Sequence, residues 1–365
     1  MVEDRTYTAS ADGSGETLNS NLGCQPKPPG KIADVVSVIL PVHNGSRWID
    51  ACLSSLEQQS YTGPIELSAF DDGSTDSSWS DLQRWAGLLE ARGMRVICGR
   101  SESSPGGCGF AKNRAVSQSS GAWLCFMDVD DVMAPERIER QLAAARAHPR
   151  ALVGARVRRE PAGSTARYIS WVNGMSQEQL VLQRFRECTL VMPTWFIARS
   201  DFDAVGGFRE EQCEDLLFLL EHVARGGRLH RVEGDPLLTY TYHAHAASHS
   251  ISRATLLRHR AAALERAVLG GWQTFSIWGA GRDGRALFKA LSPEARRKVS
   301  CFCDVDECKV GTKYQYYEYS VPVIHWRNVN RPLITCVALD RTDGAFEANL
   351  ASLGLREGAD FFYFC

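Results

Sequence analysis

Two carboxylates separated by one residue, Asp128 and Asp130, follow the apolar segment 123–127. Mg²⁺ or Mn²⁺ bound next to a phosphorylated ligand usually takes one or two protein carboxylates, and phosphate oxygens and water complete its ligands. Alternate residues at a strand exit can share one side, so both carboxylates can reach one cation. The pair therefore predicts a divalent-cation site, to which Asp131 adds charge. A polar turn that precedes the next helix is the alternative interpretation.

The elements that must position these carboxylates alternate between strand and helix. Apolar runs predict strands at 35–40, 65–70, 95–98 and 123–127, and helical spacing of apolar residues predicts helices between and after them. Such alternation is typical of an α/β layer fold with a mostly parallel sheet. Ligands of these sheets bind at the carboxyl ends of the strands. Because Asp72, Asp128 and Asp130 each follow a predicted strand, we expect them to meet at this edge.

Four motifs occur in a fixed order along this part of the chain. They read PVHN at 41–44, DDGSTD at 71–76, GFAKN at 109–113 and FMDVDD at 126–131. Each is unremarkable alone, but the ordered set resembles the family 2 glycosyltransferases of the GT-A fold, whose pattern runs PVxN, DDGSxD, GxxxARN and FxDxDD. The resemblance covers about residues 35–250. It implies an inverting, metal-dependent enzyme that uses a nucleotide-sugar donor.

The resemblance also implies roles for individual residues. Those implied to bind the nucleotide sugar are Pro41, His43, Asp72, Lys112, Asn113 and Asp128. Asp72 would accept a hydrogen bond from the uracil ring, whereas Lys112 and Asn113 would approach the diphosphate or ribose. Lys112 stands where the family commonly has Arg, which keeps the charge but loses the bidentate geometry. Asp130 would be the direct metal ligand, with His243 as a candidate metal or diphosphate contact.

A general base and an acceptor contact are expected further along the chain. Glu214-Asp215 resembles the ED motif of the family, which implies that Asp215 deprotonates the acceptor hydroxyl, with Glu214 as the second choice. Alternatively, both acids interact only with the amino terminus of the following helix, which would lower their pKa values. Trp195 is a candidate for stacking on the acceptor, and a place in the core is the alternative.

The chain is expected to divide into a disordered tail at 1–33, a GT-A domain at 34–269 and a small Rossmann-like domain at 270–365. The last range contains the loop GAGRDG at 279–284, and Asp304 follows roughly 20 residues later, as in dinucleotide-binding sites. Taken literally, the loop indicates NAD. Because the range is shorter than a full doubly wound domain, a packing or acceptor-binding role is favoured.

Composition and a narrower resemblance indicate the compartment and the acceptor. The formal net charge is −2, no segment approaches the ~20 apolar residues of a membrane span, and the cysteines lie mostly in apolar segments without a CxxC pair. These features favour a cytoplasmic protein with no membrane contact. The strings SVILPVHN, CFMDVDDVM, MPTWF, EDLLF, FCDVDE and ADFFYF are similar to those of the queuosine-tRNA galactosyltransferases, also described as beta-1,3-N-acetylglucosaminyltransferase-like proteins.

That narrower resemblance implies transfer of galactose from UDP-galactose to queuosine in the anticodon of tRNA(Tyr), so that the partners would be a UDP-sugar and a tRNA. Two alternatives stay open. One is a UDP-GlcNAc-dependent transferase that acts on another acceptor, and the other is a non-catalytic binding protein built on the GT-A fold. Sugar selection depends on pocket shape, which the sequence does not reveal.

Overall fold

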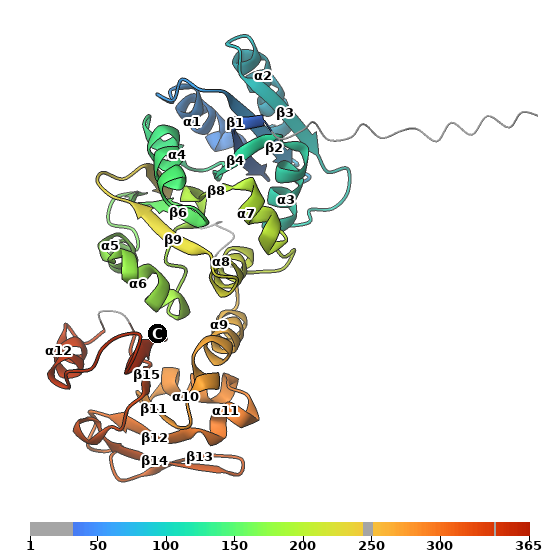
Figure 1. The fold of residues 1–365 in the computed structure, drawn as a ribbon. Coiled ribbons are helices and arrows are strands. Elements are labelled where there is room, and N and C mark those ends of the chain that lie inside the picture. The colour runs from blue at the N-terminus through green and yellow to red at the C-terminus, as the bar shows by residue number, and fades with distance from the viewer. Residues whose placement is uncertain (1–31, 244–250, 339–340) are drawn as a thin grey trace, which may run out of the picture.

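The computed structural model describes residues 32–243, 251–338 and 341–365 (Figure 1). Nearly all of the predicted tail, residues 1–31, lies outside the described residues. The first strand begins at Ile32, although order was expected from Asp34. Figure 1 shows two α/β regions, one for each of two large sheets, with helix α9 between them.

The first region is built on a seven-stranded sheet of order β3-β2-β1-β4-β8-β6-β9. Its strands are β1 (Ile32–Val42), β2 (Ile65–Asp71), β3 (Arg95–Arg100), β4 (Gly121–Phe126), β6 (Ala151–Ala155), β8 (Phe196–Ala198) and β9 (Arg228–Val232). Strands β3, β2, β1 and β4 are mutually parallel, as are β6 and β9, whereas β8 runs antiparallel to both β4 and β6. The predicted α/β class is confirmed, and β8 is the departure from a parallel sheet.

Eight helices between residues 46 and 224 accompany this sheet among the described residues. They are α1 (Ser46–Glu57), α2 (Ser78–Glu90), α3 (Cys108–Gln118), α4 (Arg137–Ala147), α5 (Ala166–Gly174), α6 (Gln177–Leu182), α7 (Arg199–Val205) and α8 (Glu214–Ala224). Helix α1 buries Ile49, Cys52, Leu53 and Leu56, because this spacing places them on one face. Ser46 is the first residue of α1, and its backbone N–H donates to Asp76 Oδ2 at 3.2 Å.

A small sheet lies beside the end of β4. It has the order β5-β10-β7 and contains β5 (Val132–Met133), β10 (Leu238–Thr241) and β7 (Val157–Glu160). Strand β10 runs antiparallel to β5 and parallel to β7. Strand β5 starts directly after Asp131, the last residue of the FMDVDD motif. The small sheet therefore brings the end of β10 to the acidic residues of this motif.

The second region contains a six-stranded sheet of order β13-β14-β12-β11-β15-β16. Its strands are β11 (Phe275–Trp278), β12 (Val299–Asp304), β13 (Lys313–Tyr316), β14 (Tyr319–His325), β15 (Leu333–Thr335) and β16 (Phe361–Tyr363). The helices of this part of the chain are α9 (Arg253–Ala267), α10 (Arg282–Ala290), α11 (Pro293–Arg297) and α12 (Ala345–Ser352). Short 3₁₀ turns occur at Gln183–Phe185, Met192–Thr194, Leu269–Gly271 and Trp326–Asn328. Among the described residues, none of the helices combines the length and apolarity that a bilayer crossing needs.

The GAGRDG loop joins β11 to α10 in a closely packed turn. A Cβ atom on Gly284 would lie 1.9 Å from the carbonyl oxygen of Gly279, so the loop tolerates no side chain there. Asp304, expected at a ribose in a dinucleotide site, instead accepts the N–H of Ala280 at 2.9 Å and lies 3.3 Å from Lys309 Nζ. These contacts favour the packing role that the sequence left open.

Two hydrophobic cores meet along α8. Phe218 and Leu219 pack in the core of the first region. Leu216 and Leu220, one turn apart on another face, pack with residues of the second region such as Phe364. The division at 269/270 therefore stays a prediction, since apolar packing continues across it.

Candidate active site

Three carboxylates converge where β4 ends. Side-chain oxygens of Asp128, Asp130 and Asp131 all lie within 4.8 Å of one another. Asp128 Oδ1 and Asp131 Oδ2 are buried and accept no hydrogen bond from the described residues. Buried carboxylate oxygens without donors are costly unless a cation satisfies them. The donor set therefore fits Mg²⁺ or Mn²⁺, both of which prefer carboxylate oxygen.

The end of β10 completes the surroundings of this cluster. His243 Nε2 lies 2.8 Å from Asp130 Oδ2, and its ring lies 4.6 Å from that of Trp48 between centroids. The N–H of Thr241 donates to Asp131 Oδ1 at 2.9 Å. The structure thus brings together Asp130 and His243, the two residues expected at the metal. Asp131 was expected only to add charge, and its buried oxygens make it a third candidate ligand.

Burial shifts the pKa values of the carboxylates in this cluster. It raises the pKa of Asp128 to about 6, against the charge of Lys112 and together with the charge of Asp130. Burial and the neighbouring charges of Asp130 and Asp128 raise the pKa of Asp131 well above its ordinary value. Arg137, fully buried and donating to Phe126 O, partly opposes both shifts. Accumulated negative charge of this kind favours cation binding.

The residues expected at the nucleotide lie side by side at the ends of β1 and β2. Pro41 is buried and pairs in register with Phe70. His43 is exposed and donates through Nδ1 to the carbonyl oxygen of Asp72 at 2.8 Å. Asp72 is 2% exposed, and its two carboxylate oxygens accept the backbone N–H groups of Gly106 and Gly107 at 2.9 and 2.8 Å. The glycine-containing loop before α3 therefore closes over the predicted uracil contact.

The two residues expected near the diphosphate take part in contacts within the protein. Lys112 is 2% exposed and donates from Nζ to Glu214 Oε1 at 2.9 Å. The side-chain amide of Asn113 donates to Phe208 O at 2.8 Å and accepts the N–H of Phe208 at 2.9 Å. Asn113 thus holds the loop before α8. The sequence showed no sign of this contact, because it joins residues 95 positions apart.

The two acids at the start of α8, Glu214 and Asp215, have pKa values that their surroundings shift in opposite directions. Burial, followed by the charge of Glu214, raises the pKa of Asp215 to about 6. Burial would also raise the pKa of Glu214, but the charge and hydrogen bond of Lys112 lower it overall. Two carboxyl groups whose pKa values are pushed apart are typical of separate acid and base roles. Asp215 Oδ1 also accepts the N–H of Leu216 at 2.7 Å, which lowers its pKa, but burial outweighs this contact. Its role as base stays a prediction.

Gly109 explains how α3 approaches α8 closely enough for the Lys112–Glu214 pair. A Cβ atom at this position would lie 2.5 Å from Arg209 O and 3.3 Å from Glu214 Cβ. Any side chain there would therefore push the two helices apart. Gly109 thus helps to position the start of α8, which carries the candidate base.

Trp195 lies in the core of the first region. Its side chain has no exposed area, and its Nε1–H donates to Leu190 O at 2.9 Å. The ring packs against those of Phe208 and Phe218, with centroids 6.2 and 5.6 Å away. The structure favours the core alternative for Trp195, since a ring without exposed area has no face to offer an acceptor.

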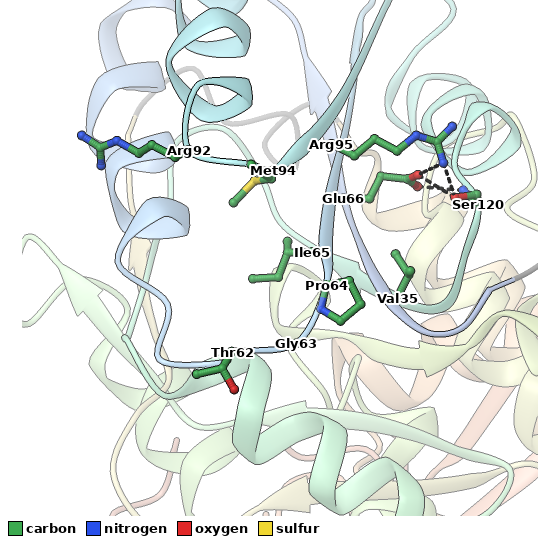
Figure 2. Close-up of a pocket in the computed structure, with 11 residues that line it drawn as sticks. Val35, Thr62, Gly63, Pro64, Ile65, Glu66, Arg92, Met94, Arg95 and Ser120 are labelled. Atoms are coloured by element: carbon green, nitrogen blue, oxygen red, sulfur yellow. Dashed lines mark hydrogen bonds and ion pairs between the residues drawn. The ribbon is translucent and has the colours of Figure 1, made fainter.

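A pocket lies at the opposite, amino-terminal edge of strands β1, β2 and β3, where Figure 2 shows its lining residues. Its buried acid, Glu66, accepts hydrogen bonds from Ser37, from the backbone and hydroxyl of Ser120, and from Arg95. All of these distances lie between 2.7 and 2.8 Å. Both carboxylate oxygens of Glu66 already have partners, so this acid offers no chemistry comparable to that of the acidic cluster.

Comparison with known proteins places this geometry in a family. Residues 37–206 match the family model of glycosyl transferase family 2, so this stretch carries a domain of that family. The chain is 29% identical over 108 residues to glycosyltransferase GlyG of Streptococcus pneumoniae, which covers 30% of this chain and 34% of the relative. It is 31% identical over 109 residues to the Escherichia coli protein UDP-Glc:alpha-D-GlcNAc-diphosphoundecaprenol beta-1,3-glucosyltransferase WfgD, covering 30% and 40%. The match thus spans less than half the length of these relatives.

Solved structures show the same fold. The mannosyltransferase PcManGT of Pyrobaculum calidifontis, in complex with GDP-Man and Mn²⁺, has a TM-score of 0.52 at 20% identity over 76% of this chain and 75% of its own. Staphylococcus aureus TarS, in complex with UDP-GlcNAc, has a TM-score of 0.50 at 18% identity over 64% and 67%. These likenesses confirm the predicted GT-A fold.

Proposed function

We propose that this protein is a metal-dependent, inverting glycosyltransferase that moves galactose from UDP-galactose to queuosine in the anticodon of tRNA(Tyr). The observation that carries the proposal is the convergence of three carboxylates at the end of β4 in a family 2 domain. The base candidate Asp215 lies at the start of α8, linked to α3 through the Lys112–Glu214 pair.

Asp128, Asp130 and Asp131 are the carboxylates that would hold the metal, and His243 would support them. A divalent cation supplies charge stabilisation for a diphosphate leaving group in this chemistry. His243 orients the Asp130 carboxylate through its 2.8 Å contact, and the Thr241 N–H orients that of Asp131. Such supporting contacts are typical of metal sites that must hold their ligands in one geometry.

The proposed chemical step needs one proton acceptor. Asp215 takes the proton of the acceptor hydroxyl as the oxygen attacks the anomeric carbon, and the bond to the diphosphate breaks on the opposite face, which inverts the configuration. Glu214 is the poorer base because Lys112 stabilises its ionised form. A base with a pKa of about 6 is ionised at neutral pH and still close enough to neutrality to accept a proton.

The donor is inferred from the nucleotide-binding residues and from similar proteins. Asp72 offers a buried carboxylate to the uracil N–H, and its two oxygens retain lone pairs beyond those used by Gly106 and Gly107. The printed name of WfgD specifies UDP-glucose, and TarS was solved with UDP-GlcNAc. The choice of galactose and of queuosine rests on the narrower sequence resemblance, which also suggests action in the cytoplasm, where mature tRNA is found.

A donor panel tests the proposal. Purified protein with Mn²⁺ or Mg²⁺ is offered UDP-galactose, UDP-N-acetylglucosamine or GDP-mannose together with total tRNA, and nucleosides are followed by mass after digestion. We expect a hexose increment on queuosine with UDP-galactose alone. Without such an increment the acceptor assignment fails, while release of UDP from the donor would keep the transferase class. If no donor is consumed under any condition, the protein is a non-catalytic member of the fold.

A further inference from the structure

A guanidinium group with unused donors lies next to the candidate active site. Arg159 belongs to β7 and pairs in register with Tyr240 of β10. Its guanidinium carbon lies 3.9 Å from the ring centre of Tyr240 and 5.1 Å from that of Tyr242. The Nε and Nη1 groups are buried, yet they have no hydrogen-bond partner within the described part of the chain. Buried charged donors without partners are costly, and an anionic ligand would satisfy them.

The two tyrosines fix the direction of this group. Arg159 and Tyr240 pair in register on neighbouring strands, so their side chains lie on one face of the small sheet, and alternation along β10 places Thr241 on the other face. The Arg159 guanidinium lies over the rings of Tyr240 and Tyr242. Stacking on a tyrosine ring holds a guanidinium in place while leaving its edge free for hydrogen bonds.

The electrostatic neighbours of the tyrosines place this surface close to the reacting groups. Burial raises the pKa of Tyr240 to about 12, a hydrogen bond from Arg159 lowers it, and the charges of Asp128 and Asp131 raise it further. Geometry agrees with this proximity, because the N–H of Thr241, the next residue along β10, donates to Asp131 Oδ1 at 2.9 Å.

We propose that Arg159, held by Tyr240 and Tyr242, binds a phosphate group of the acceptor. The inference rests on the proposed transferase function and deepens it, since it assigns one residue of this chain to a phosphate of the tRNA acceptor. A planar guanidinium with two free N–H directions matches phosphate oxygens in bidentate geometry. Aromatic rings beside an arginine are also typical of surfaces that bind single-stranded nucleotides.

The donor diphosphate is the competing ligand for Arg159, and the order of the small sheet argues against it. The donor must reach the cluster of Asp128, Asp130 and Asp131, which directly precedes β5. Arg159 belongs to β7, and β10 lies between β7 and β5. The positive charge of Arg159 is therefore one strand removed from the cluster, which favours a phosphate of the acceptor.

Transfer assays on two acceptors test the inference. One acceptor is tRNA that contains queuosine, and the other is the free queuosine nucleoside, which has no phosphate. For Arg159→Gln we expect kcat/KM for the tRNA to fall about 10- to 100-fold, the loss typical of a charge-assisted hydrogen bond, with the nucleoside unaffected within about twofold. Arg159→Lys should recover part of the loss, because it keeps the charge without the planar geometry.

The matched control is Arg225→Gln. Arg225 follows the end of α8 that is remote from Asp215, is 55% exposed, and pairs with Glu221 at 2.7 Å. This variant removes one positive charge without touching the proposed site, so both acceptors should be used as by the wild type. An equal loss for tRNA and nucleoside in Arg159→Gln, or a raised KM for the donor, would overturn the inference. If the wild type uses neither acceptor, the proposed function has failed instead.

A binding measurement tests phosphate binding by Arg159 even if the wild type uses neither acceptor. Protein saturated with UDP and Mg²⁺ is titrated with inorganic phosphate at constant ionic strength, and its thermal unfolding is followed. The Tm of the wild type and of Arg225→Gln should rise with phosphate, because a ligand that binds only the folded state stabilises it. The Tm of Arg159→Gln should not rise. No rise in the wild type, or the same rise in Arg159→Gln, would refute phosphate binding at this residue.

Discussion

Replacing Lys112 by methionine tests the buried ion pair that gives the two candidate bases, Glu214 and Asp215, different pKa values. The ammonium group lies 2.9 Å from Glu214 Oε1, and the two side chains are only 3% and 13% exposed. Removing one member of a buried pair leaves the other charge without compensation, at a cost of about 3–5 kcal/mol. Methionine preserves most of the volume beside the ring of Phe208, which lies 5.5 Å from Nζ, so the loss reports charge rather than a cavity.

The pH dependence gives this prediction a distinct signature. The pKa of Glu214 is lowered overall by Lys112 in spite of burial. A depressed pKa in the folded state contributes stability above the unfolded value, here ordinarily 4.5, and the contribution is lost as pH falls through the folded value. Lys112 stays protonated throughout this range, because its pKa is raised well above its ordinary value. The stability difference between wild type and Lys112→Met should therefore narrow in acid.

Urea unfolding of wild type and Lys112→Met at several pH values measures the effect. The double variant Lys112→Met/Glu214→Gln is the control, since it removes both charges and should recover much of the stability. A difference below about 1 kcal/mol at neutral pH, or one that does not change with pH, would refute the reasoning. Loss of UDP affinity without loss of stability would instead assign the ammonium group to the donor diphosphate.

Three further predictions concern the metal, the base and the core. Asp130→Ala should weaken Mn²⁺ binding at least ~10-fold in a calorimetric titration, because it removes the carboxylate that His243 orients. Unchanged affinity would exclude Asp130 as a ligand. Below a pH of about 6, kcat/KM should fall about tenfold per pH unit, since Asp215 must be unprotonated to act as base and its pKa is raised to about 6. A pH profile of kcat/KM that stays level well below this pH would exclude that role. Trp195→Ala should cost about 3–5 kcal/mol in urea unfolding with the acceptor KM unchanged, because the buried ring is packed on all sides; a raised acceptor KM without destabilisation would contradict the core assignment.

Local patterns were sufficient to predict that the residues of the candidate site meet at one edge of the sheet. Apolar runs that end in Asp72 and Asp128 are encoded over a few residues each, and the geometry of parallel strands then brings their ends together. The order of the motifs identified the GT-A fold for the same reason, since each motif follows one strand or begins one helix. The start of α8 at Glu214 agrees with the helix expected from the sequence at the Glu214-Asp215 pair.

Contacts between distant segments could not be read in this way. The pairing of Asn113 with Phe208, and of Lys112 with Glu214, depends on how closely α3 approaches α8, which the packing at Gly109 decides. The registration of Arg159 with Tyr240 depends on the small sheet, whose strands are short and far apart in the chain. Trp195 illustrates a further limit, because a tryptophan beside a site and one beneath it have the same local sequence.

The position of α8 between two hydrophobic cores constrains how the sequence of this protein can evolve. Its first turn carries the candidate base, while Leu216 and Leu220 are embedded among side chains contributed by residues beyond 260. The carboxy-terminal unit is therefore not a freely exchangeable module. A lineage that lost or replaced it would expose apolar side chains on α8 and shift Asp215, so the two halves should accept substitutions together rather than independently.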